Sequence, residues 1–210
     1  MTALADLVDT SASVGAVRGR LEKIRRLADL LGRLAPDEVA IATAFLTGST
    51  RQGRMGVGGA LIRAAHDVPP APVATLTLHD VDAAFAELAA ISGAGSTRAR
   101  QDRLGRLFER ATGDEQDFLI RLLFGELRQG AVEGVLLDAV ARAASVPPAR
   151  VRRAAMLAGN LAEVATAVLA GGETALDRFR VQVLRPVQPM LAETAEDIDS
   201  AVAALGTPSL

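Results

Sequence analysis

The chain has 210 residues, half of them hydrophobic, and its formal net charge is −2 because 25 acidic residues outnumber 23 basic ones. A chain of this length and composition buries about 70% of its unfolded surface, which excludes a disordered linker. The absence of cysteine excludes disulfides, thiolate metal sites and a cysteine nucleophile, and no apolar run approaches the roughly 20 residues of a membrane span.

Apolar residues recur at helical spacing, and aromatic residues are scarce, so the sequence predicts an all-α fold. Ser13 is the expected N-cap of a long opening helix that continues to Leu34, and Pro36 begins a second helix that contains Phe45. Further helices are expected before Val68, from Thr77 or Asp80 to Ile91, from Ser96 to Gly113, from Asp114 as N-cap to Gly130, and over 131–144, 148–159 and 161–169.

The character of the sequence changes at Phe179. Residues 180–184 alternate like a short extended segment, and Pro186 and Pro189 exclude a helix over the residues around them. We therefore expect a helical domain over residues 1–178. Residues 179–210 are expected to form an extended linker and the start of another domain.

One segment of the sequence occurs twice. Residues 45–53, Phe-Leu-Thr-Gly-Ser-Thr-Arg-Gln-Gly, return as residues 122–130, Leu-Leu-Phe-Gly-Glu-Leu-Arg-Gln-Gly, and each copy leads through an apolar helix to Val-Pro-Pro-Ala. Two copies of one helix–turn–helix unit can pack about a pseudo-twofold axis. The sequence therefore predicts two pseudo-twofold-related halves with their Arg-Gln-Gly turns side by side. The backbone of duplex DNA has matching symmetry.

These turns are candidate phosphate-binding elements, because backbone N–H groups at a helix start and nearby arginines are typical partners of phosphate. A second candidate is the helix start after the Gly-Ala-Gly-Ser segment at 93–96. The net charge argues against a polyanionic ligand, but all basic residues except Lys23 are arginines, which pair bidentately with phosphate. The predicted DNA-binding residues are Arg51, Gln52, Gly53, Arg54, Gly56, Gly58, Gly95, Ser96, Arg98, Arg128, Gln129 and Gly130.

Three segments together resemble one family: Ser-Gly-Ala-Gly-Ser-Thr-Arg at 92–98, Arg-Leu-Leu-Phe-Gly-Glu-Leu-Arg-Gln-Gly-Ala at 121–131, and Arg-Pro-Val-Gln-Pro-Met-Leu-Ala at 185–192. In order and spacing they resemble the amino-terminal DNA-binding domain of bacterial and archaeal ATP-dependent DNA ligases. The resemblance implies an all-helical domain that grips the minor groove of nicked duplex DNA, without sequence preference, in replication, repair and recombination.

The resemblance also implies partners and cofactors. The partners are duplex DNA with a nick and the ligase's own nucleotidyltransferase and OB domains; no membrane is involved, and the chain is expected to be a monomer. ATP and Mg²⁺ are implied for the parent ligase, with no cofactor in this chain. We expect a cytoplasmic, nucleoid-associated protein.

The chain departs from the family in one respect. Such ligases form lysyl-AMP on a Lys-x-Asp-Gly motif beyond the Pro-Met-Leu-Ala segment, and that motif is absent here, where Lys23 is the sole lysine. The chain looks like a ligase cut at its first domain boundary. We therefore expect no catalytic residue in it and no ligase activity from it alone.

Two other classes of function are open on the residues alone. A helical protein–protein scaffold would have scattered arginines, whereas a DNA-binding domain would have the Arg-Gln-Gly turns and Arg98 on one face. A small-molecule enzyme would need a nucleophile and a base, which no motif supplies. His66 and His79 lack partners at metal-ligand spacing and are interpreted as ordinary surface histidines, and no metal site is expected.

Overall fold

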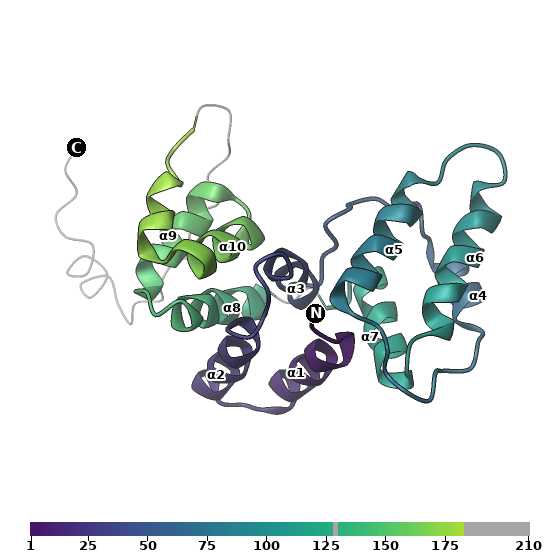
Figure 1. Ribbon diagram of the computed structural model, residues 1–210, viewed down its shortest axis with the longest axis horizontal. Coiled ribbons are helices and arrows are strands. Elements are labelled where there is room, and N and C mark those ends of the chain that lie inside the picture. The colour runs from purple at the N-terminus through teal and green to yellow at the C-terminus, as the bar shows by residue number, and fades with distance from the viewer. Residues whose placement is uncertain (128–129, 183–210) are drawn as a thin grey trace, which may run out of the picture.

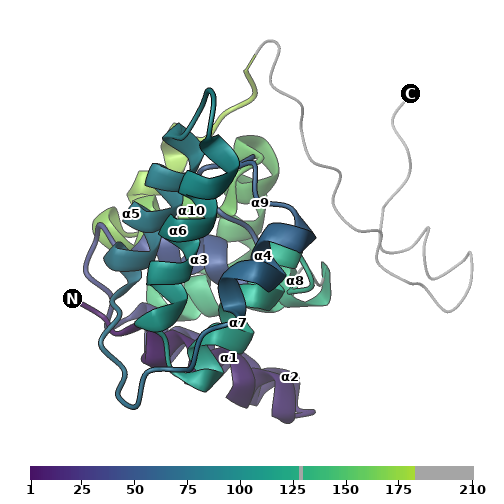
Figure 2. The ribbon, with the colours of Figure 1, turned by 90° about the vertical axis from the view of Figure 1, so that its right-hand side faces the viewer.

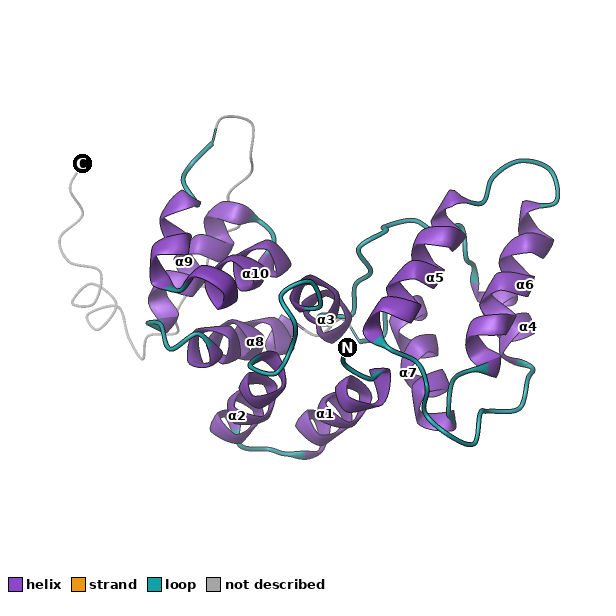
Figure 3. Cartoon of the chain, in the orientation of Figure 1, coloured by secondary structure: helices purple, strands orange, loops and turns teal. Residues whose placement is uncertain are grey.

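The computed structural model describes residues 1–127 and 130–182, and within these ranges the chain is all-α, as the sequence predicts (Figure 3). Only an isolated antiparallel bridge between Ala3 and Thr77 departs from helix and loop there. None of the helices in the described ranges combines the length and the apolar character that crossing a membrane requires. The helices are α1 (Leu4–Ala16), α2 (Arg20–Leu31), α3 (Val39–Leu46), α4 (Gly59–His66), α5 (Leu78–Ala90), α6 (Ser96–Glu109), α7 (Gly113–Phe124), α8 (Gly130–Ala143), α9 (Pro148–Ala158), α10 (Leu161–Gly171) and the 3₁₀ helix η1 (Glu173–Arg178).

The helices form two groups, which α1 and α3 join (Figure 1). One group contains α4, α5, α6 and α7, and the other contains α2, α8, α9, α10 and η1. Helix α1 packs against α2 and α7, and α3 packs against α10 and α5, so each contacts both groups. Figure 2 shows the first group from its outer side, with α6 in front. The buried apolar residues consequently form one continuous core.

Two phenylalanine rings join the groups at the centre of this core. Phe45 of α3 and Phe85 of α5 are fully buried, and their rings meet edge to face with centroids 5.9 Å apart. Edge-to-face pairs add to the free energy of burial because the positive ring edge meets the negative ring face. The position of α5 relative to α3 therefore depends on this contact.

The amino terminus is held by one buried carboxylate, that of Glu38. It accepts hydrogen bonds from the backbone N–H and the hydroxyl of Thr2, at 2.6 and 2.7 Å, and from the N–H of Ala35 at 3.0 Å. Burial alone would raise the pKa of this carboxyl, but the hydrogen bonds from Thr2 and Ala35 and the nearby terminal amino group outweigh it, so the pKa is lowered.

The prediction of one long opening helix is wrong. Helix α1 ends at Ala16, Val17 is extended, and α2 begins after Gly19, so two helices pack against each other where one was expected. Ser13 lies inside α1, where its hydroxyl donates to the carbonyl of Thr10. Leu21 completes the apolar spacing in sequence, yet it is 79% exposed. The turn at Gly19 lets both apolar faces reach the core, which one straight helix would not allow.

The predicted limits of α7 are also wrong. Thr112, not Asp114, is the N-cap: its side chain accepts from the N–H of Glu115, whose carboxylate accepts from the N–H of Thr112 at 2.8 Å. This reciprocal pair is a capping box. The helix ends at Phe124 rather than Gly130, because Gly125 adopts a left-handed conformation with φ +73°.

Other expectations have mixed outcomes. The helix predicted after Leu34 is present as α3, but it begins at Val39 rather than at Pro36. Thr77 caps α5 with Asp80 in a second capping box. The pseudo-twofold relation between two halves stays a prediction, since the second helices of the two copies have different neighbours: α4 packs against α6 and α7, and α8 against α2, α9 and α10. The boundary at residue 179 also stays a prediction, because residues 183–210 lie outside the described ranges.

We expect Glu38→Gln to lower the free energy of unfolding at pH 7 by about 1–3 kcal/mol, because an amide in place of the carboxylate removes charge-assisted hydrogen bonds. The folded-state pKa of Glu38 lies below its usual value, so this contribution is present above about pH 4.5 and is lost as pH falls through the folded-state pKa. Urea unfolding at pH 7 and pH 3 measures the difference, with Glu109→Gln at an exposed position as the control. Equal loss in both variants at pH 7 would contradict the expectation.

Candidate nucleic-acid interface

The two copies of the sequence repeat end their first helix in the same way. Gly48 after α3 has φ +70°, and Gly125 after α7 has φ +73°. In both turns the residue after the glycine donates its N–H to the carbonyl five residues back, at 2.9 Å. This pattern is the Schellman motif, which glycine favours because it adopts positive φ without steric cost. At these two helix ends the repeat in the sequence is thus also a repeat of backbone geometry.

The first Arg-Gln-Gly turn is attached to α5. The side-chain amide of Gln52 donates to both the carbonyl and the carboxylate of Asp82, at 3.1 and 2.9 Å. Arg51 forms an ion pair with the same carboxylate at 3.3 Å. Asp82 therefore positions the turn and neutralises part of the charge on Arg51. Both residues were predicted as DNA contacts, and the structure gives them a role in holding the turn.

The residues that follow in the turn are more open. Gly53, Arg54 and Gly58 are exposed, and Gly58 is the N-cap of α4. Gly56 has φ +68°, and a Cβ at this position would lie 2.9 Å from the guanidinium carbon of Arg100 in α6. Because Arg100 also donates to the carbonyl of Ile91, its guanidinium is not free to move aside. The glycine-rich turn is therefore packed closely against the first turns of α6.

The start of α6 lies next to this turn through Arg100. Gly95 is its N-cap, with φ +78°, and Ser96 is its first residue. The side chain of Arg98 is 89% exposed, and its nearest carboxylate oxygen, on Asp102, is 4.0 Å away. The structure thus brings the predicted residues of the first turn and of the α6 start into one neighbourhood.

The second Arg-Gln-Gly turn is described in part. Arg128 and Gln129 lie outside the described ranges, and Gly130 is the first residue of α8. The residues before the second turn lie close to the first turn. Gly56 and its neighbours line the same hollow, of about 320 Å³, as Leu122 and Leu123 of α7. The first turn and the end of the helix that leads to the second turn are therefore side by side.

Two further exposed arginines, which are not among the predicted DNA-binding residues, border the same area. Arg63 is on α4, and Arg121 is in the last turn of α7. Within residues 1–127 and 130–182, neither they nor Arg54 form a salt bridge. Spacing gave no signal for Arg63, because only the packing of α4 against α7 places it here.

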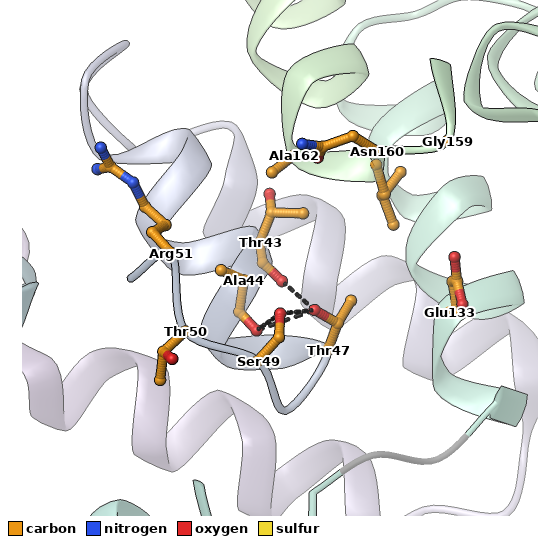
Figure 4. A pocket seen from close by; sticks show the side chains of 11 residues that line it. Thr43, Ala44, Thr47, Ser49, Thr50, Arg51, Glu133, Gly159, Asn160 and Ala162 are labelled. Carbon is orange, nitrogen blue, oxygen red and sulfur yellow. Dashed lines mark hydrogen bonds between the residues drawn. The ribbon is translucent and has the colours of Figure 1, made fainter. Parts of the chain in front are cut away.

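A cavity of about 500 Å³ lies on another side of the first turn (Figure 4). Thr43, Thr47 and Ser49 are on one wall, and Glu133 and Asn160 are opposite, while the side chain of Arg51 points away. Thr47 donates to backbone carbonyls of α3 and contacts the Ser49 hydroxyl at 3.1 Å. These contacts close the end of α3 and so support the turn.

The histidines have structural neighbours. The ring of His66 meets Phe108 edge to face at 5.5 Å, and His79 pairs with Asp37 at 3.1 Å. Among the residues that the structure describes, no group of three or more acidic, histidine or cysteine side chains is placed to hold a metal ion.

Comparison with known proteins identifies relatives over the whole chain. Residues 64–141 match the family model described as DNA ligase N terminus. The chain is 54% identical over 208 residues to a "Probable DNA ligase" of Anaeromyxobacter sp. (strain Fw109-5), and 52% identical over 209 residues to one of Mycobacterium sp. (strain KMS). The alignments cover 99% and 97% of this chain but 40% and 39% of those relatives. The chain thus spans about two fifths of their length.

We expect Gly56→Ala to lower the free energy of unfolding by about 1–2 kcal/mol, because a Cβ is strained at positive φ and would press on Arg100. Gly134→Ala is the matched control, because no heavy atom lies within 4 Å of a Cβ placed at this position inside α8. Since alanine favours a helix interior over glycine, this change should raise the free energy of unfolding by about 0.5–1 kcal/mol. Chemical denaturation measures both. A neutral Gly56→Ala would show that the turn is not packed as described.

Proposed function

We propose that this chain binds duplex DNA for an ATP-dependent DNA ligase, the family whose amino-terminal domain it matches. The observation that carries the proposal is the equal backbone geometry at the ends of α3 and α7. The residues after α3 and the last turn of α7 line one hollow, and exposed arginines lie nearby. Arginine and backbone N–H groups are the usual partners of phosphate, and glycine allows a nucleic-acid backbone to come close.

In the proposed complex the contacts are of two kinds. The first N–H groups of α4 and α6 have no partner within their own helix and are suited to phosphate oxygens. Arg54 and Arg98 are exposed beside these helix starts and supply positive charge. Arg51 and Gln52 hold the turn on Asp82, so their contribution to DNA binding is largely positional. We extend the proposal to Arg128, Gln129 and Gly130 because the first copy of the repeat has the same residues.

The proposed binding mode is independent of sequence. Contacts to phosphates and to the narrow minor groove do not distinguish base pairs well, whereas readout of bases requires side chains in the major groove. We propose that the natural ligand is a duplex with a nick, held in replication, repair and recombination for the nucleotidyltransferase and OB domains of a ligase. ATP and Mg²⁺ would act in those domains.

We expect Arg54→Ala and Arg98→Ala to weaken binding to all duplexes alike and to reduce the slope of log affinity against log salt by about 0.9 each. Fluorescence anisotropy on a nicked duplex and two unrelated intact duplexes, over a salt series, measures both quantities. Arg25→Ala is the matched control, because Arg25 is on α2 and pairs with Glu22 at 2.7 Å and Asp29 at 2.8 Å. Equal slopes in all variants, or strong preference for one sequence, would contradict the proposal.

We also expect no adenylylation of this chain. Lys23 is its sole lysine, and it lies on the surface of α2 outside any Lys-x-Asp-Gly motif, so no amine is placed to attack the α-phosphate of ATP. Incubation with radiolabelled ATP and Mg²⁺, followed by denaturing electrophoresis, tests this. A covalent label that disappears in Lys23→Arg would show that the lysine is a nucleophile.

A further inference from the structure

One aromatic side chain differs from all others in the protein. Of the six phenylalanines, five are at most 8% exposed, but Phe124 is 41% exposed. It is the last residue of α7, directly before the glycine that ends the helix. An exposed aromatic ring at this point contributes little to the core, so its value to the fold does not explain it.

The ring of Phe124 lies against the beginning of α4. A Cβ built on Gly59 would be 3.1 Å from the ring edge and 3.5 Å from a guanidinium nitrogen of Arg63. The absence of a side chain at Gly59 therefore leaves room for the ring and for the arginine beside it. Arg63 is on α4, which follows the first turn, and Phe124 is on α7, which precedes the second. The two side chains meet beside Gly59, where α4 packs against α7.

The surroundings of the ring favour a polyanion with an apolar surface between its charges. Arg63 is exposed beside the ring, Arg121 is exposed three residues before Phe124 on α7, and Arg54 lies on the hollow at the end of α7. A protein partner would be expected to need a wide apolar patch, since stable interfaces bury roughly 800 Å² per side. A single ring among arginines instead suits the minor groove, where deoxyribose lies between two lines of phosphates.

We propose that Phe124 enters the minor groove and packs against deoxyribose, with Arg63 on an adjacent phosphate. This inference rests on the proposed function and adds two residues to it. The apolar contact makes the affinity partly independent of salt, because burying the ring releases no counterions, whereas each arginine contact does release them.

The test compares Phe124→Ala with Phe124→Leu, Arg63→Ala and Leu21→Ala. Leu21 is the matched apolar control, 79% exposed on α2 in the other group of helices. Fluorescence anisotropy on a nicked duplex is measured over a salt series. We expect Phe124→Ala to weaken binding about fivefold with an unchanged salt slope, an effect typical of a half-buried ring. Phe124→Leu should retain most of the affinity, Arg63→Ala should reduce the slope by about 0.9, and Leu21→Ala should change neither.

The outcomes separate this inference from the proposed function. If the unmodified chain binds DNA and Phe124→Ala binds equally well, Phe124 is not a contact and only the inference is overturned. If the unmodified chain binds no duplex at low salt, the proposed function fails and the inference fails with it. Thermal unfolding of Phe124→Ala by circular dichroism should match that of the unmodified chain closely. A large loss of stability, or a reduced salt slope, would mean that the substitution disturbs the turns, and it would overturn the assignment of an apolar contact.

Discussion

The contact between Phe45 and Phe85 is the constraint on which the arrangement of the turns depends. It joins α3 to α5 across the two groups of helices. The first turn begins a few residues after Phe45, beyond the end of α3, and Asp82, which holds Gln52 and Arg51, is one helical turn before Phe85. The turn is therefore fixed to α5 by an apolar contact at its beginning and a polar one in its middle. A loop held at two points loses less conformational entropy when it binds a ligand.

Hydrophobic spacing and capping residues predict most of the helices, but they do not predict how the helices pair. Leu21 fits the apolar spacing of a single helix over residues 13–34, and nothing local shows that α2 turns back on α1 at Gly19. Which face of α2 is buried depends on α8, a helix distant in sequence that packs against it. By contrast, the end of α3 just before Gly48 is predicted well, because a glycine with positive φ is a local requirement. The end of α7 is not predicted: the expected helix continues to Gly130, whereas α7 ends at Phe124, before Gly125.

The candidate site shows the same division. The repeated glycine turns are visible in the sequence because their backbone geometry is local. The partners of the arginines are not visible, since they come from other helices: Asp82 is 31 residues from Arg51, and Asp138 pairs with both Arg20 at 2.7 Å and Arg152 at 2.5 Å. Clusters of arginine in the sequence therefore do not distinguish side chains that hold the fold from those available to a ligand. Arg63 and Phe124 become candidates only when α4 and α7 are seen together.

These pairings also explain how a chain with net charge −2 can present a surface suited to a polyanion. Several carboxylates are already engaged by arginines that hold helices together, among them those of Asp82, Asp138 and Asp177. Charges farther apart than about 8–10 Å are largely screened at physiological salt, so a phosphate responds to nearby groups rather than to the sum over the chain. Around the turns those groups include Arg54 and Arg63, which have no salt-bridge partner in the described ranges. Arg54 and Arg63 can therefore act on a nearby phosphate although the whole chain is acidic.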